Sequence, residues 1–197
     1  ENLKKFSNKP SFSSFGKTVN YAESDELSKK FAAYLQKNTD LVPGDRIALM
    51  MPNIIQYPIA LHGALRAGLV VVNVNPLYTS RELSYQLKDS GAKAIVIFEN
   101  AAHVLAECVG ELDGLKYIFT TEIGDMLGFP KSVAINFVLK YIKKLVPAYK
   151  LPQAIQLKKV LSTGDSKSFQ KVTQINLDSI AFLQYTGGTT GVSKGAM

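Results

Sequence analysis

The chain has 197 residues, of which 46% are hydrophobic and 20% charged. These proportions are typical of a globular protein with a buried core, and they exclude a disordered, collagen-like or coiled-coil chain. Cys108 is the single cysteine, so an intramolecular disulfide is excluded and a reducing compartment is favoured. No apolar stretch opens the chain, so no signal peptide is predicted and a cytoplasmic location is expected.

The first elements are predicted to be a hairpin and a helix. Ser11–Phe15 and Thr18–Asn20 flank Gly16 and Lys17, and a glycine at the first central position fits a type II′ turn. Asn20 is then placed to cap a helix. Apolar residues at positions 27, 31, 34 and 35 form one stripe of that helix.

Strands and helices then alternate three times with short links. Strands are predicted at Arg46–Met51, Leu69–Val74, Ala94–Phe98 and Tyr117–Thr120, and the helices between them at 53–68, 79–91 and 100–109, with Asn53 and Thr79 as caps. Thr79 and Glu82 have the spacing of a capping box. The fold class expected is α/β, with a mainly parallel sheet and helices on both of its faces.

The longest apolar stretch, Ile54–Val74, is not predicted to span a membrane. It contains Arg66, and a charge near the centre of a span costs about 2.5–3.5 kcal/mol on insertion scales. A buried helix that stops near Gly68, followed by a buried strand, fits this pattern better.

A loop rich in glycine and threonine, residues 185–195, follows the apolar run Ile180–Tyr185. Glycines allow backbone amides to approach a ligand closely, hydroxyls add donors, and a lysine adds positive charge, so the segment can bind an anion. Its order of residues fits neither the Walker A loop nor the dinucleotide loop. A solvated turn with a surface lysine is the alternative. The candidate contacts are Thr186, Gly187, Gly188, Thr189, Thr190, Gly191 and Lys194.

These residues, followed by Gly195, resemble the phosphate-binding signature of the adenylate-forming enzymes, with Ser193 where proline or alanine is commoner. The resemblance continues upstream. Gly44-Asp45-Arg46 and Pro52-Asn53 resemble segments that recur in that superfamily. Val71–Tyr78 in combination with Gln184–Gly191, and the segment 128–131, are similar to bacterial long-chain fatty acyl-CoA synthetases. The chain is thus identified as an incomplete N-terminal domain of such an enzyme over residues 1–197, with 185–195 as its phosphate-binding loop.

The resemblance implies that a fatty acid reacts with ATP to give an acyl-adenylate, from which coenzyme A then takes the acyl group. It implies Mg²⁺ as cofactor, with the Thr186 hydroxyl as a ligand, and Thr189 and Thr190 on phosphate oxygens. No catalytic residue is assigned, because the family's other motifs are expected beyond Met197, and this chain alone is expected to be inactive. The alternatives are a medium-chain or aryl-CoA ligase, an acyl-AMP ligase, and a non-catalytic peripheral membrane-binding domain.

Residues 126–164 contain seven lysines and no acidic residue, and the rest of the chain is balanced in charge. We interpret this segment as a basic amphipathic insertion. A helix is predicted between Pro130 and Pro147, with Ser132, Asn136, Lys140, Lys143 and Lys144 in one narrow arc opposite a wide apolar face. Two hypotheses remain open. Residues 131–150 bind an anionic membrane at the inner face of the cell membrane, or the helix packs on the core with a solvated lysine edge.

Nucleic-acid binding is not expected, since arginine is scarce and no aromatic RNA-binding motif is found. Cys108, His62 and His103 have no partners at metal-binding spacing. They are predicted to be packing or surface residues.

Overall fold

The computed structural model describes residues 5–186 and 194–197. Within these residues, a seven-stranded sheet has the strand order β7-β6-β5-β3-β4-β8-β9. Neighbouring strands run parallel except for β8 and β9, which are antiparallel. The mainly parallel sheet expected from the sequence is therefore confirmed.

The elements keep the alternation expected from the sequence and add several that were not predicted. The strands are β1 Pro10–Ser14, β2 Lys17–Asn20, β3 Arg46–Met50, β4 Val70–Asn73, β5 Ala92–Phe98, β6 Tyr117–Thr121, β7 Ile155–Gln156, β8 Phe182–Thr186 and β9 Lys194–Ala196. The α-helices are α2 Tyr21–Asn38, α3 Gln56–Arg66, α4 Ser80–Ser90, α5 Ala102–Cys108, α6 Lys131–Phe137 and α7 Leu157–Thr163. Short helical turns are η1 Glu99–Ala101, η2 Val109–Glu111, η3 Ile123–Met126 and η5 Ser166–Ser168, and η4 Val138–Ile142 is a π-helical continuation of α6.

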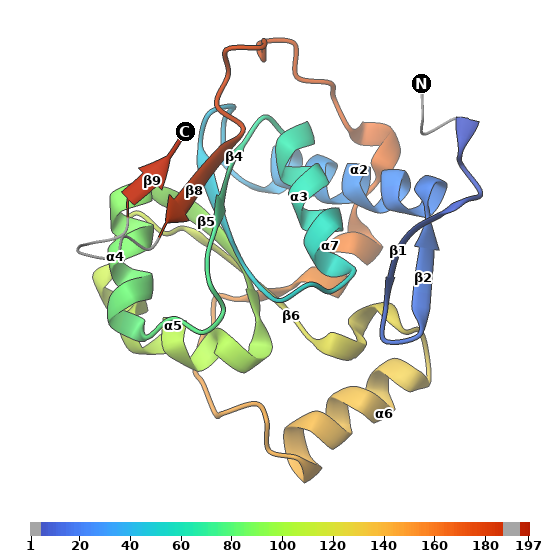
Figure 1. The fold of residues 1–197 in the computed structure, drawn as a ribbon, viewed down its shortest axis with the longest axis vertical. Coiled ribbons are helices and arrows are strands. Elements are labelled where there is room, and N and C mark those ends of the chain that lie inside the picture. Colours follow the sequence, from blue (N-terminus) through green and yellow to red (C-terminus); the bar gives the residue numbers. More distant parts are fainter. Residues whose placement is uncertain (1–4, 187–193) are drawn as a thin grey trace.

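Helices cover both faces of the sheet. Figure 1 shows α2, α3 and α7 on one face and α4 and α5 on the other. Side chains alternate along a strand, and in β3 Ile47 and Leu49 join the first core cluster whereas Ala48 and Met50 join the second. The strand is buried on both faces, which explains why its sequence is a continuous apolar run.

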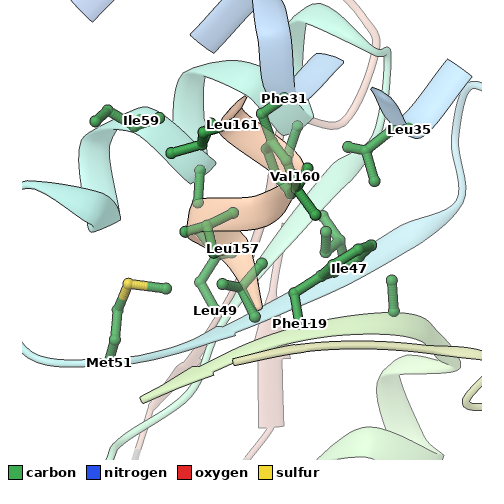
Figure 2. Packing of buried hydrophobic residues seen from close by; sticks show 14 of the residues in the cluster. Phe31, Leu35, Ile47, Leu49, Met51, Ile59, Phe119, Leu157, Val160 and Leu161 are labelled. Carbon is green, nitrogen blue, oxygen red and sulfur yellow. The ribbon is translucent and has the colours of Figure 1, made fainter. Parts of the chain in front are cut away.

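Helix α7 and strand β7 come from the lysine-rich segment and were not predicted. Leu157, Val160 and Leu161 of α7 are buried in the first core cluster. Figure 2 shows these three side chains close to Phe31 of α2 and Phe119 of β6. Lys158 and Lys159 of α7 are exposed, so a segment of high positive charge contains a core helix.

Local capping chemistry is confirmed at two helices. The Glu23 amide donates to Asn20 Oδ1 at 2.8 Å, and the Asn20 amide donates to the Glu23 carboxylate at 2.9 Å. Thr79 and Glu82 make the same reciprocal pair at the start of α4. Helix α4 ends at Gly91, whose φ of 61° is the left-handed conformation that glycine adopts without strain.

Two local predictions are wrong. The hairpin turns at Phe15 and Gly16, with φ of 49° and 75°, and Ser14 pairs with Lys17. Positive φ at both central residues defines a type I′ turn, whose twist matches that of the strands. The turn is therefore of a different type from the predicted type II′ turn and lies one residue earlier in the chain. Asn53 does not cap a helix, because a separate turn after Pro52 delays the start of α3 to Gln56.

Candidate functional site

The described ends of the glycine-threonine loop meet where β8 ends. Thr186, the last residue of β8, is the ladder partner of Lys194, the first residue of β9. Both residues are exposed. The other predicted phosphate contacts, Gly187, Gly188, Thr189, Thr190 and Gly191, lie outside the described residues. The structure thus brings Thr186 and Lys194 together at the carboxyl end of the parallel strands, where open α/β sheets bind ligands.

A hydrogen-bond network on one side of β8 connects it to the body of the sheet. Tyr57 donates its hydroxyl to Asn73 Oδ1 at 2.8 Å, and Asn73 Nδ2 donates to Gln184 Oε1 at 3.0 Å. Gln86 Nε2 donates to the Asn73 carbonyl at 2.8 Å. Asn73 therefore joins α3 and α4 to β8 at Gln184, the residue directly before the loop.

Tyr185 anchors β8 on the opposite side. Its hydroxyl donates to Asp89 Oδ2 of α4 at 2.5 Å. Burial, together with the hydrogen bond to the Asp89 carboxylate, raises the pKa of Tyr185 well above its usual range. The ring also lies against Gly195 of β9, where an added Cβ would approach Tyr185 Cε2 to 3.0 Å. The neutral tyrosine thus fixes both strands that carry the loop.

A cavity of about 700 Å³ opens at the carboxyl ends of β3, β4 and β5. Pro52, residues 76–80 and residues between 98 and 107 line it, including Asn100 and His103. The Nδ1 atom of His103 is buried and has no hydrogen-bond partner within the described residues. Apolar walls with a few polar groups suit a small organic ligand. No single sequence pattern predicts this cavity, because three separate connections build it; the polar residue Asn100, shortly after the apolar strand β5, was a local signal.

Metal-binding side chains are not gathered in the part of the chain that the structure describes. No group of three or more His, Cys, Asp or Glu residues there could hold a metal ion. Cys108 is buried in the second core cluster, and burial raises the pKa of its thiol. His62 lies at the surface beside the Phe12 ring, with their centroids 6.1 Å apart. These residues pack as the sequence analysis predicted.

The helix formed by α6 and η4 attaches to the molecule by its polar edge. Asn136 Nδ2 donates to Glu122 Oε2 at 2.7 Å, and Lys140 Nζ lies 2.7 Å from Glu99 Oε1. The apolar residues on its other sides are exposed: Val133 by 61%, Phe137 by 54%, Tyr141 by 62% and Ile142 by 63%. No residue of α6 or η4 is buried.

This arrangement contradicts the hypothesis of a core-packed helix with a solvated lysine edge. The predicted polar arc also does not stay together. Asn136 and Lys140 contact Glu122 and Glu99 in the body of the protein. Lys143 and Lys144 come after Ile142, the last residue of η4, and so are not part of the helix. The π-helical pitch from Val138 onward changes the angle between successive residues, so a constant 100° spacing fails there. None of the described helices is both long and apolar enough to cross a membrane.

Comparisons with known proteins identify the family of the chain. The family model of the AMP-binding enzymes matches residues 1–197. The chain is 52% identical to a long-chain-fatty-acid–CoA ligase from Yersinia pestis over 98% of the chain and 34% of that relative. It is 34% identical to a protein of the same name from Bacillus subtilis over 98% of the chain and 34% of that relative.

Solved structures show the same arrangement of elements. A long-chain-fatty-acid–CoA ligase from Archaeoglobus fulgidus matches 99% of the chain and 34% of its own length, at 25% identity and a TM-score of 0.72. An anthranilate–CoA ligase in complex with anthranoyl-AMP matches 98% of the chain and 32% of its own length, with a TM-score of 0.78; at 16% identity it supports the fold alone. The chain spans about a third of the length of the relatives it matches. It belongs to the family of AMP-binding enzymes.

Proposed function

We propose that the protein carrying this chain joins a long-chain fatty acid to coenzyme A with ATP as the energy source. The observation that carries the proposal is the pairing of Thr186 with Lys194 where β8 ends. It occurs in a chain about half identical to proteins named long-chain-fatty-acid–CoA ligase. The pairing holds both ends of a loop whose composition suits phosphate binding.

The chemistry proceeds in two transfers. A carboxylate oxygen of the fatty acid attacks the α-phosphorus of ATP, and the bond to the bridging oxygen breaks, so that pyrophosphate leaves. The thiol of coenzyme A then attacks the acyl carbonyl carbon, AMP leaves with the bonding electrons, and the thiol proton passes to solvent. Negative charge gathers on the departing pyrophosphate, and Lys194 with the hydroxyls of the loop stabilises it in place.

Magnesium fits this site as a partner of the phosphates. Mg²⁺ takes few protein oxygens and keeps waters and phosphate oxygens as its remaining ligands. The Thr186 hydroxyl is a hard oxygen donor at the strand end and would supply the protein's contribution. When bound, the ion would neutralise part of the phosphate charge.

Product analysis tests the proposal against its alternatives. The intact protein is incubated with ATP, coenzyme A and either oleate, octanoate or benzoate. We expect oleoyl-CoA and AMP to form fastest. Faster turnover of octanoate or benzoate would indicate a medium-chain or aryl ligase. Release of oleoyl-AMP without a thioester would indicate an acyl-AMP ligase, and the absence of all products would leave only a non-catalytic role.

We propose further that the apolar side of α6–η4 meets the acidic lipids of the inner face of the cell membrane. Phe137, Tyr141 and Ile142 are exposed. Lys143 and Lys144 follow them directly in the chain, and the exposed Lys150 comes six residues later. The segment 126–164 has no acidic residue that would repel such a surface. Each lysine near an anionic membrane contributes about 1 kcal/mol.

Vesicle flotation of the intact protein tests this second proposal. We expect the protein to float with phosphatidylglycerol vesicles at low salt and to stay behind with neutral vesicles. Phe137→Ser combined with Ile142→Ser should abolish flotation. Leu177→Ser is the matched control, because Leu177 is fully exposed in another segment. Absence of flotation with the unaltered protein would refute the proposal.

A further inference from the structure

The two strands that carry the loop have a packed face and an exposed face. Side chains alternate along a strand, and in β8 Leu183 and Tyr185 pack against the second core cluster. Gln184 and Thr186, the residues that follow each of them, are exposed. Lys194 of β9 is the ladder partner of Thr186, and residues directly opposite each other in an antiparallel pair project to the same face. Thr186 and Lys194 therefore share the exposed face, and Tyr185 lies on the packed one.

On the packed face, Tyr185 joins β8 to helix α4. Its hydroxyl donates to Asp89 Oδ2 at 2.5 Å, across 96 positions of the chain. Asp89 lies in the last turn of α4, whose two ends are capped by Thr79 and Gly91. Figure 1 shows β8 and β9 beside this helix. The end of β8 is thus tied to a helix that is itself fixed at both ends.

Gly195 allows β9 to contact the same ring. It is the ladder partner of Tyr185, and a Cβ added to it would lie 3.0 Å from Cε2 and 3.1 Å from Cζ of that ring. Gly195 is not among the glycines with positive φ, so glycine is needed there for space and not for its backbone freedom. The missing side chain lets the Tyr185 ring extend past β9 to Asp89.

Strand β9 has little other support among the residues that the structure describes. It is three residues long, and all three are exposed. It lies at the edge of the sheet and pairs there with β8. The ladder to β8 and the contact of Gly195 with the Tyr185 ring therefore set the position of β9, and with it the position of Lys194 relative to Thr186.

We propose that Asp89 and Tyr185 are positioning residues for the phosphate-binding loop, which hold Lys194 of β9 opposite Thr186. Tyr185 lies on the packed face, and the negative charge of Asp89 would repel a phosphate. The pair therefore acts through Lys194, the group proposed to stabilise the departing pyrophosphate. The inference rests on the proposed function, since it gives the pair a task in that reaction.

The effect of the pair should appear in kcat more than in KM for ATP. Lys194 opposes negative charge that develops as pyrophosphate leaves. A displaced Lys194 therefore weakens binding of the transition state more than binding of ATP itself. Loss of one hydrogen bond to a charged acceptor corresponds to a fall in rate of about tenfold.

Exchange of labelled pyrophosphate into ATP by the intact protein, with oleate as the acid, tests the positioning role. Tyr185→Phe keeps the ring beside Gly195 and removes only the hydroxyl. We expect it to lower kcat about tenfold, with a change in KM for ATP of less than about twofold. Asp89→Ala should have the same effect, whereas Asp89→Asn keeps an oxygen acceptor and should restore most of the rate. Tyr21→Phe is the matched control, because Tyr21 begins α2 on the opposite face of the sheet; it should leave both constants unchanged.

A double-mutant cycle separates positioning from a general loss of stability. If the pair acts through Lys194, Tyr185→Phe should lower kcat in the unaltered protein and have no further effect in the Lys194→Ala background. An equal fall in both backgrounds would overturn the proposal, as would an unchanged kcat in Tyr185→Phe.

Hydrogen exchange gives a second readout that does not depend on activity. We expect protection of a peptide covering 194–196 to fall about tenfold in Tyr185→Phe and in Asp89→Ala. Gly195→Ala should lower it too, because the added Cβ would press on the Tyr185 ring. Peptides covering β3 report any general unfolding. Unchanged protection of 194–196 in all three variants would overturn the proposal.

The two readouts distinguish failure of this inference from failure of the proposed function. If the unaltered protein shows no oleate-dependent exchange while the variants still lose protection of 194–196, the proposed function is refuted and the positioning of β9 by Asp89 and Tyr185 stands. If oleate-dependent exchange occurs and the variants match the unaltered protein in both readouts, the proposed function stands and the positioning role is refuted.

Discussion

Replacing Leu157 with alanine tests whether the lysine-rich segment contributes to the core. Leu157 is 0% exposed and belongs to the cluster that contains Phe31 and Phe119. The substitution removes three carbon atoms, worth about 0.8 kcal/mol each for transfer from water. The cavity left behind adds to this cost, so we expect a loss of about 2–5 kcal/mol in unfolding free energy.

Urea unfolding followed by far-ultraviolet circular dichroism measures the loss as a lower midpoint. Leu177→Ala is the matched control, because Leu177 is fully exposed and its truncation should cost no more than about 0.5 kcal/mol. If Leu157→Ala has as small an effect as Leu177→Ala, α7 does not pack in the core, and the reasoning from its buried apolar stripe is refuted.

Three further substitutions test other parts of the structure. Thr79→Ala removes the capping box of α4 and should lower the unfolding free energy by about 1 kcal/mol, measured as the urea midpoint. Gly63→Ala places a Cβ 2.7 Å from Phe31 Cδ1 and 2.9 Å from the Ser28 carbonyl oxygen, so it should destabilise by about 1–3 kcal/mol; Gly110→Ala, with nothing within 4 Å, is its control. Asn73→Ala releases Gln184 beside the loop and, at about 1 kcal/mol per lost hydrogen bond, should raise KM for ATP roughly fivefold; an unchanged KM would contradict this positioning role.

The sequence predicts those parts of the fold that depend on neighbouring residues. Asn20 with Glu23, and Thr79 with Glu82, carry their capping partners within one turn, so the starts of α2 and α4 are readable locally. The apolar runs Arg46–Met51 and Leu69–Val74 likewise predicted strands β3 and β4, because the pattern lies within each run. The turn of the first hairpin was predicted one residue too late, because it places Phe15 at a positive φ, which bulky residues rarely adopt.

Features that depend on distant contacts could not be predicted. Leu157 and its neighbours were concealed among lysines, and only contact with α2 and β6 reveals them as core. The amphipathic pattern of 132–146 was recognised, yet it gives no indication that its polar edge would face inward to Glu99 and Glu122. At the candidate site, the composition of the loop predicts phosphate binding, which stays a prediction, while the pairing of Thr186 with Lys194 needed the structure.

The central claim is that the loop between Thr186 and Lys194 holds the phosphates of ATP during activation of a fatty acid. Exchange of labelled pyrophosphate into ATP by the intact protein, with and without oleate, measures that step directly. We expect oleate-dependent exchange that Lys194→Ala lowers about 10²-fold, the usual cost of removing one group that stabilises developing charge. Lys159→Ala, a substitution of an exposed lysine on α7, should leave the rate unchanged. Exchange at equal rates in the two variants would contradict the account.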